Sequence, residues 1–170
     1  ETEQTTSLTN FDFDMNGMGN IMGMESVLCN TELNLPIVVI AARRGVRVVQ
    51  VMVDGFQWMG GAWSLDDVST LAISPQTSDL HLAVAYGSGK IRLYEWRGNS
   101  FRSLGDLKDG DKAHARGVNS IAFSPLGISH RGRNMLLVSG GQDQKVRVWD
   151  VSSPSADPLE TINCRNEEDN

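Results

Sequence analysis

The chain has 170 residues, a net charge of −6 and a pI of about 5.0. An acidic balance argues against the general basic face of a nucleic-acid-binding protein, although it leaves room for a local basic patch. The two cysteines, Cys29 and Cys164, are far apart in sequence and form neither a disulfide framework nor a zinc motif, so we expect an intracellular protein, cytoplasmic or nuclear.

The first 24 residues differ from the rest of the chain. Residues 1–10 are polar and rich in Thr, whereas residues 11–24 mix Gly and Asn with Phe and Met. Gly-rich sequence disfavours regular structure, while Phe and Met supply adaptable apolar contacts. We therefore expect residues 1–24 to form a flexible lead-in. The alternative is a docking segment built on Phe11, Phe13 and the Met cluster.

Strand-forming residues dominate the chain beyond this segment. Apolar and polar residues alternate with period two between turn residues, which is the signature of short strands. The longest apolar run, at 35–42, is too short to cross a bilayer, so we predict no membrane span. In chain order, we predict strands at about 25–30, 35–41, 44–50, 55–59, 68–75, 89–95, 100–107, 118–125, 136–138, 144–151 and 158–164, with another around Val84.

The strand pattern occurs three times. Residues 89–95 align with residues 144–150, and residues 44–50 form a third, weaker copy. The copies start 45 residues apart (44 to 89) and 55 residues apart (89 to 144), close to the roughly 40–45 residues of a four-stranded repeat unit. Equivalent positions are held by Arg47, Arg92 and Arg147 in one column and by Val49, Tyr94 and Trp149 in another. The sequence therefore predicts an all-β chain of about three repeated units.

The third copy resembles one complete blade of a WD-repeat β-propeller, over residues 114–125, 134–143 and 144–151. In that family a His before the first strand, a Ser or Thr in the second, an Asp in the turn and a Trp in the third form a buried hydrogen-bonded chain. The resemblance assigns these positions to His114, Ser139, Asp143 and Trp149. It implies four-stranded antiparallel blades, and it gives the four residues a structural role.

The two earlier copies depart from this pattern. Val49 and Tyr94 stand where the third copy has Trp149, and Val84 stands where it has Ser139. Ser88 and Arg43 replace the turn Asp143, so we expect those blades to be held together by packing alone. The predicted organisation is a lead-in at 1–24, blades at about 25–60, 65–108 and 114–164, and an acidic tail at 165–170.

Three blades are too few for a closed ring. Propellers typically have four to eight blades, and an open stack exposes strand edges that invite further pairing. We therefore expect the chain to belong to a larger propeller. A longer polypeptide supplying the missing blades is favoured, and completion of the ring by partner chains is the alternative.

The sequence contains no complete catalytic or metal-binding motif. Ser139 lacks the G-x-S-x-G context of a hydrolase nucleophile, and residues 87–90 lack the first Gly and the final hydroxyl of a phosphate-binding loop. Asp106, Asp109 and Asp111 lack calcium-loop spacing, and the three His show no metal spacing. We therefore predict a protein that is not an enzyme and holds no cofactor or metal.

The best interaction candidates lie in loops. In WD-repeat propellers, the turns between second and third strands share one face with the segments that lead into each blade, and that face is the family's usual partner platform. The resemblance places Arg43, Arg44, Arg116 and Gln142 there as candidate contacts, and a basic loop with His130, Arg131 and Arg133 on the opposite face.

These observations favour a non-enzymatic scaffold that serves as a subunit of a larger multiprotein assembly, with other proteins as partners. The alternative is an RNA- or nucleic-acid-associated subunit. Its phosphate contacts would be Arg43, Arg44, Arg131 and Arg133.

Overall fold

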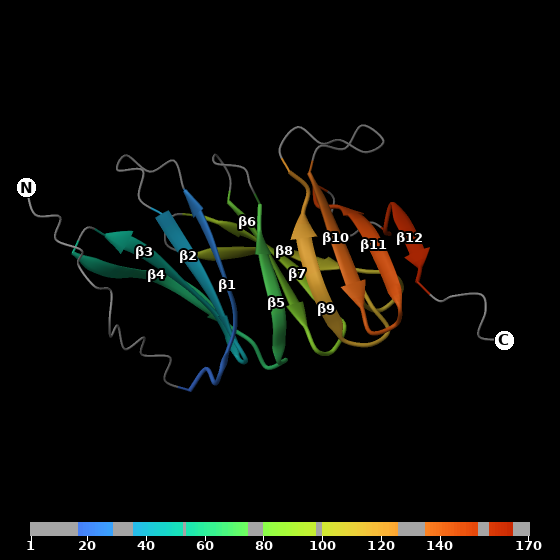
Figure 1. Ribbon diagram of the computed structural model, residues 1–170, viewed down its shortest axis with the longest axis horizontal. Coiled ribbons are helices and arrows are strands. Elements are labelled where there is room, and N and C mark those ends of the chain that lie inside the picture. Colours follow the sequence, from blue (N-terminus) through green and yellow to red (C-terminus); the bar gives the residue numbers. More distant parts are fainter. Residues whose placement is uncertain are drawn as a thin grey trace, which may run out of the picture.

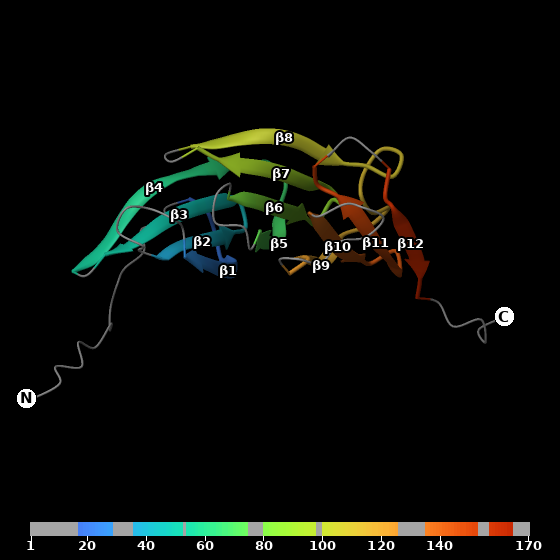
Figure 2. The ribbon, with the colours of Figure 1, turned by 90° about the horizontal axis from the view of Figure 1, so that it is seen from above.

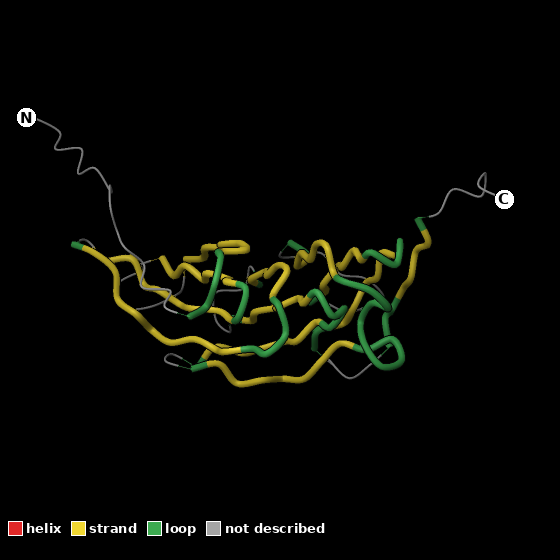
Figure 3. Tube along the Cα trace, turned by 90° about the horizontal axis from the view of Figure 1, so that it is seen from below, coloured by secondary structure: helices red, strands yellow, loops and turns green. Residues whose placement is uncertain are grey.

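The computed structural model describes residues 17–28, 36–52, 54–74, 80–97, 100–125, 135–152 and 157–164, without the side chains of Val27, Leu28 and Trp63. Strands, turns and loops make up these residues, with no helix among them (Figure 3). The expectations for Phe11, Phe13, the basic loop with His130, Arg131 and Arg133, and the tail at 165–170 lie outside the described residues.

The described strands form three antiparallel sheets of four strands each, so the predicted all-β fold class is confirmed. In each sheet the strands follow chain order from one edge to the other. The first sheet holds β1 (Ile21–Leu28), β2 (Pro36–Ala42), β3 (Gly45–Met52) and β4 (Gly55–Trp63). The second holds β5 (Val68–Ile73), β6 (His81–Tyr86), β7 (Ile91–Trp96) and β8 (Phe101–Leu107). The third holds β9 (Val118–Phe123), β10 (Leu136–Gly141), β11 (Lys145–Asp150) and β12 (Glu160–Asn163).

The three sheets stand side by side like consecutive blades of an open ring (Figure 1). Their first strands, β1, β5 and β9, are neighbours, and the outermost strands, β4, β8 and β12, lie along the opposite rim (Figure 2). The second sheet separates the first from the third, so the described strands form an open arc and not a closed ring.

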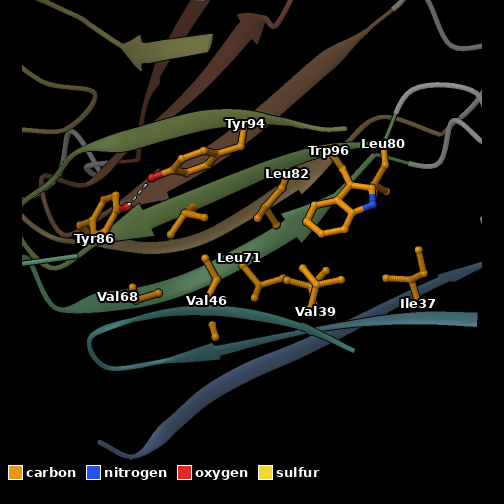
Figure 4. Packing of buried hydrophobic residues seen from close by; sticks show 13 residues of the cluster. Ile37, Val39, Val46, Val68, Leu71, Leu80, Leu82, Tyr86, Tyr94 and Trp96 are labelled. Carbon is orange, nitrogen blue, oxygen red and sulfur yellow. Dashed lines mark hydrogen bonds between the residues drawn. The ribbon is translucent and has the colours of Figure 1, made fainter. Parts of the chain in front are cut away.

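Two apolar clusters hold the sheets together. The cluster between the first and second sheets includes Val39, Val46, Leu82 and Trp96 (Figure 4). The cluster between the second and third sheets is built from the other face of the second sheet, because alternate residues of a strand point to opposite faces. Leu82 is fully buried, and burial of such a side chain stabilises the fold by about 1.5–3 kcal/mol.

Both interfaces follow one rule of side-chain size. The face that a sheet turns towards the sheet before it carries aromatic rings, which are Tyr94 and Trp96 in the second sheet and Trp149 in the third. The opposing face carries small aliphatic residues, such as Val48 in the first sheet and Ala83 in the second. Large residues set against small ones fill the interface without voids.

The first sheet begins earlier than the sequence predicted. β1 starts at Ile21, four residues before the expected start at Glu25, so part of the expected lead-in belongs to the sheet. Met18 is buried as well, with an exposed fraction of 1%. Glycines obscured the strand in the sequence, yet Gly23 has a β-bulge beside it and open space around its Cα, so it causes no conflict.

Other boundaries move by a few residues. β4 runs on to Trp63, beyond the predicted end at residue 59, because Gly60 and Gly61 remain paired with β3. β12 covers Glu160–Asn163 and is shorter than the predicted strand at 158–164. The order and pairing of the strands are unaffected.

Candidate functional site

A chain of hydrogen bonds crosses the buried side of the third sheet. Nε1 of Trp149 on β11 donates to Oγ of Ser139 on β10, over 2.8 Å. The same Oγ lies 2.8 Å from Nε2 of His114, and Nδ1 of His114 lies 2.8 Å from Oδ1 of Asp143. The structure therefore brings together all four residues that the sequence singled out. His114, Ser139 and Trp149 are almost wholly buried.

One arrangement of protons satisfies the chain. Ser139 Oγ accepts the indole N–H of Trp149, so its own proton is free to be donated to Nε2 of His114. The imidazole proton then sits on Nδ1 and is donated to Asp143. The contact of 2.9 Å between Arg147 Nη1 and His114 Nδ1 is in this arrangement a close approach between two donors, and Nη1 donates to Oδ2 of Asp143 over 3.0 Å.

Burial sets the charge of the two titratable groups. Desolvation lowers the pKa of His114 below its usual value, and the neighbouring Asp143 only partly offsets this, so the imidazole is neutral near pH 7. Desolvation by itself raises the pKa of Asp143. The hydrogen bonds from His114, Arg147 and the backbone of Ala115 outweigh it and lower the pKa to about 2.

Arg147 ties this chain to the second sheet. Its Nε and Nη2 donate to Oδ2 of Asp109, in the segment that leads out of β8, over 2.8 and 2.6 Å. The guanidinium is 4% exposed and also bonds Asp143. Sequence reasoning identified Arg147 only as one of three equivalent arginines and missed its role in linking the two sheets. The repeated Arg at the same strand position was the available signal.

The other two sheets use different contacts at the same positions. In the second sheet the hydroxyls of Tyr86 and Tyr94 lie 3.5 Å apart. In the first sheet Nε of Arg47 donates to the sulfur of Met18 over 3.1 Å, where the third sheet has Arg147 and His114. The polar chain is thus specific to the third sheet among the described residues.

Backbone hydrogen bonds join the turns and the segments that lead into each sheet. We call this surface the turn face; it consists of the turns at 43–44, 87–89 and 142–144 and the lead-in segments at 17–20, 64–67 and 112–117, at the lower edge of Figure 1. Its bonds run from Arg43 N to Asn20 O, Arg44 N to Met18 O, Ser64 N to Arg44 O, Val68 N to Arg43 O, Gly87 N to Asp67 O, His114 N to Gly89 O and Gln142 N to Gly117 O. Each turn is thereby fixed to a lead-in segment.

Gly89 shows how closely these segments approach. Its backbone has a φ of 90°, in the left-handed region that favours glycine. A Cβ at this position would lie 2.1 Å from the carbonyl oxygen of His114 and 2.4 Å from that of Arg116. A glycine is therefore required where the second turn contacts the third lead-in segment.

The candidate contact residues all lie on the turn face. Arg43 is engaged there, since its Nε and Nη2 donate to Oδ2 of Asp67 over 2.9 and 2.8 Å. Arg44, Arg116 and Gln142 are exposed. The structure adds Leu65, whose side chain is fully exposed on the lead-in segment of the second sheet. Sequence reasoning missed Leu65 because it is a single apolar residue in a polar loop.

The arrangement of Ser139, His114 and Asp143 has the order of a hydrolase triad without its chemistry. Ser139 is 1% exposed, and its Oγ already accepts the N–H of Trp149, so a substrate carbonyl cannot reach this oxygen. Within the described residues, no group of three or more His, Cys, Asp or Glu side chains is placed to hold a metal ion. The same residues contain no helix that could cross a membrane.

Comparison with known proteins agrees with this geometry. Residues 107–150 match the family model described as WD domain, G-beta repeat. Residues 107–150, which include β9, β10 and β11, therefore match one WD repeat, and the chain is similar to WD-repeat proteins. It is 32% identical over 92 residues to the WD repeat-containing protein 18 of Homo sapiens, a match that covers 52% of this chain and 20% of that protein. It is 31% identical over 112 residues to the protein transport protein sec13 of Aspergillus clavatus, covering 56% of this chain and 36% of that protein.

Two solved structures share the fold. A chain of the Chaetomium thermophilum Polycomb Repressive Complex 2 bound to GSK126 superposes with a TM-score of 0.62 at 14% identity, covering 83% of this chain and 31% of that one. A chain of apo ctPRC2 in an autoinhibited state gives a TM-score of 0.60 at 13% identity, covering 78% and 28%. The chain thus spans about a third or less of the length of these relatives and structures.

Replacing Trp149 tests the polar chain of this WD-repeat blade. We expect Trp149→Ala to lower the free energy of unfolding by about 3–5 kcal/mol, because a large buried aromatic is lost. Trp149→Phe keeps an aromatic ring but loses the indole N–H and part of the ring volume, so it should cost less, about 1–3 kcal/mol. Tyr94→Ala should cost less than Trp149→Ala, since its hydroxyl contact is long. Urea unfolding followed by circular dichroism measures all three. Equal, small losses for Trp149→Ala and Tyr94→Ala would contradict the assigned register.

The buried His114 makes stability depend on pH. Its pKa in the folded chain lies below the unfolded value of 6.5, so below that pH the unfolded chain binds a proton that the folded chain does not. The free energy of unfolding should fall as the pH drops below about 6.5, by at most about 1.4 kcal/mol per pH unit from this group. Asp143 contributes a further decrease in the free energy of unfolding as the pH falls from 3.8 towards about 2.

Urea unfolding at pH 8, 6 and 5 measures the effect of His114. His114→Gln serves as the control, because it removes the titrating imidazole while all carboxylates and the other two histidines remain. The variant should be less stable at pH 8 but should lose less stability between pH 8 and 5. The same pH slope in both proteins would show that His114 is not buried as a neutral imidazole.

Proposed function

We propose that this chain is part of a non-enzymatic, intracellular WD-repeat scaffold that works as a subunit of a larger multiprotein assembly. The turn face carries the proposal. Its backbone bonds hold three turns and three lead-in segments in one fixed arrangement, while Arg44, Leu65, Arg116 and Gln142 remain exposed on it. A rigid surface with exposed aromatic, apolar or Arg side chains binds partners without first ordering its loops.

The free faces of the outer sheets also favour assembly. On the first sheet, Met24 is 60% and Trp58 is 44% exposed, and the guanidinium of Arg47 lies over the Trp58 ring at 5.5 Å. On the third sheet, Val138 is 39% and Ile162 is 51% exposed. One free face thus carries a large aromatic residue and the other carries aliphatic residues, as in the two interfaces within the chain. Further sheets, from the same polypeptide or from a partner, would cover both faces.

The named relatives support the same reading. One is a protein transport protein, and the structural neighbours are chains of a complex with several subunits, the Polycomb Repressive Complex 2. The nucleic-acid alternative gains no support from the described residues, because Arg43 is committed to Asp67. Asp66 also lies in a lead-in segment, and Asp109 and Asp111 come directly before another. These carboxylates would repel a phosphate backbone.

Quantitative recovery of the assembly tests this function. The chain, in its natural full-length protein, is tagged in cells, and its native complex is weighed and its components identified by mass spectrometry. We expect one set of partner proteins at fixed stoichiometry. The paired variant Arg44→Glu with Leu65→Asp should reduce their recovery at least about tenfold, as for loss of an interface anchor worth more than 1.4 kcal/mol.

Gln57→Glu provides the matched control. Gln57 is exposed on β4, and the strand register places it towards the end of the first sheet away from the turn face. Its replacement should leave recovery unchanged. Recovery of the tagged protein at its own mass alone, or equal recovery with the turn-face variant and the control, would overturn the proposed function.

A further inference from the structure

We propose that a hollow on the turn face of the third sheet binds an acidic side chain of the protein partner. The hollow is lined by Arg116, Gln142, Asp143 and Gln144 and has a volume of about 180 Å³. This inference rests on the proposed scaffold function and gives its partner surface a specific chemistry, a carboxylate held by a guanidinium.

Arg116 supplies the charge. Four other arginines of the described residues are committed to carboxylates: Arg43 to Asp67, Arg92 to Asp106, Arg97 to Glu95 and Arg147 to Asp109. Arg116 is exposed and has no ion pair or side-chain hydrogen bond within the described part of the chain. Its planar guanidinium can therefore donate two parallel hydrogen bonds to an incoming carboxylate.

Asp143 does not oppose an anion as strongly as its position suggests. Its Oδ1 accepts from His114 Nδ1 and from the backbone N of Lys145, at 2.8 and 3.3 Å. Its Oδ2 accepts from Arg147 Nη1 and from the backbone N of Ala115, at 3.0 and 3.2 Å. Four donors thus occupy the carboxylate, and one of them is the guanidinium of Arg147, which also pairs with Asp109.

Gln144 reaches the rim of the hollow through an unusual backbone conformation. Its φ is 60°, and it is the one non-glycine residue with positive φ among those that the structure describes. Gly89 holds the equivalent place in the second turn, where the third lead-in segment leaves no room for a Cβ. The third turn therefore carries an amide side chain at a position where the second turn cannot.

Gln142 completes the lining. Its backbone N donates to Gly117 O over 2.8 Å, which fixes the turn against the segment that carries Arg116. Its exposed side chain offers amide donors beside the guanidinium. The backbone that carries these donors is thus held in place before a carboxylate arrives, so binding need not order the turn.

The charges around the hollow favour a single carboxylate over a polyanion. A second hollow, lined in part by Lys112 and Lys145, adjoins the same turn and lead-in segment. Across the two hollows four cations face three carboxylates, which are Arg116, Arg147, Lys112 and Lys145 against Asp109, Asp111 and Asp143. This slight excess of positive charge on a chain of net charge −6 suits one acidic side chain. Nucleic acid binding needs several phosphate contacts in a row, which the three carboxylates would disrupt.

A peptide titration tests the hollow directly. The probe is the blocked tripeptide Ala-Glu-Ala, and its control is Ala-Gln-Ala. Nuclear magnetic resonance follows the Nε–H of Arg116 and the side-chain amides of Gln142 and Gln144. We expect the Glu peptide to shift these resonances saturably and the Gln peptide to leave them in place. Raising the salt concentration should weaken the binding.

Two variants assign the effect to Arg116. Arg116→Gln should weaken binding of the Glu peptide at least about tenfold, the loss expected for a hydrogen bond to a charged group. Lys108→Gln removes an exposed cation outside the turn face and should leave the binding unchanged. Equal shifts with both peptides, no saturable shift, or full binding by Arg116→Gln would overturn the proposal.

Two further probes separate the possible anions. Inorganic phosphate and a single-stranded oligonucleotide are titrated under the same conditions. Binding of the oligonucleotide more tightly than the Glu peptide would overturn the acidic-peptide assignment in favour of nucleic acid. Failure of the peptide titration leaves the proposed function standing if the assembly is recovered with intact partners, so the two claims fail separately.

Discussion

The backbone bonds between turns and lead-in segments are the constraint on which this chain depends. Apolar packing stacks the sheets, but it is non-directional and does not by itself fix how one turn lies against the next segment. The bonds from His114 N to Gly89 O and from Gln142 N to Gly117 O do so, and they leave no space for a side chain at Gly89. The turn face and the hollow beside Arg116 follow from this arrangement.

The three sheets show that one architecture tolerates different internal chemistry. The third sheet uses a neutral His114 between Ser139 and Asp143, with Arg147 carrying the network to Asp109. The first two sheets use aliphatic and aromatic packing at the same places. A fully satisfied buried network is directional and rigid, whereas apolar contacts tolerate substitution. The sheet with the polar network is also the one whose turn forms the hollow.

Sequence reasoning reached the fold because its signals are local. Alternation around Arg147 and Trp149 marks a strand, and the repeat of that pattern fixes the number of sheets. Features created by long-range contact were beyond it. Met18 sits in a Gly-rich segment yet is buried, because Arg44 N bonds its carbonyl and Arg47 contacts its sulfur. Asp109 pairs with Arg147 across 38 residues, and only the fold brings them together.

The central claim is that the turn face is rigid before any partner binds, and amide hydrogen exchange on the chain measures this directly. The amides of Arg43, Gly87, His114 and Gln142 each donate to a carbonyl of a neighbouring segment. Their exchange should be slowed to a degree similar to that of the strand amides of β10, because exchange then requires the segments to separate. Exchange of these four amides as fast as that of the exposed loop residue Asp111 would contradict the account.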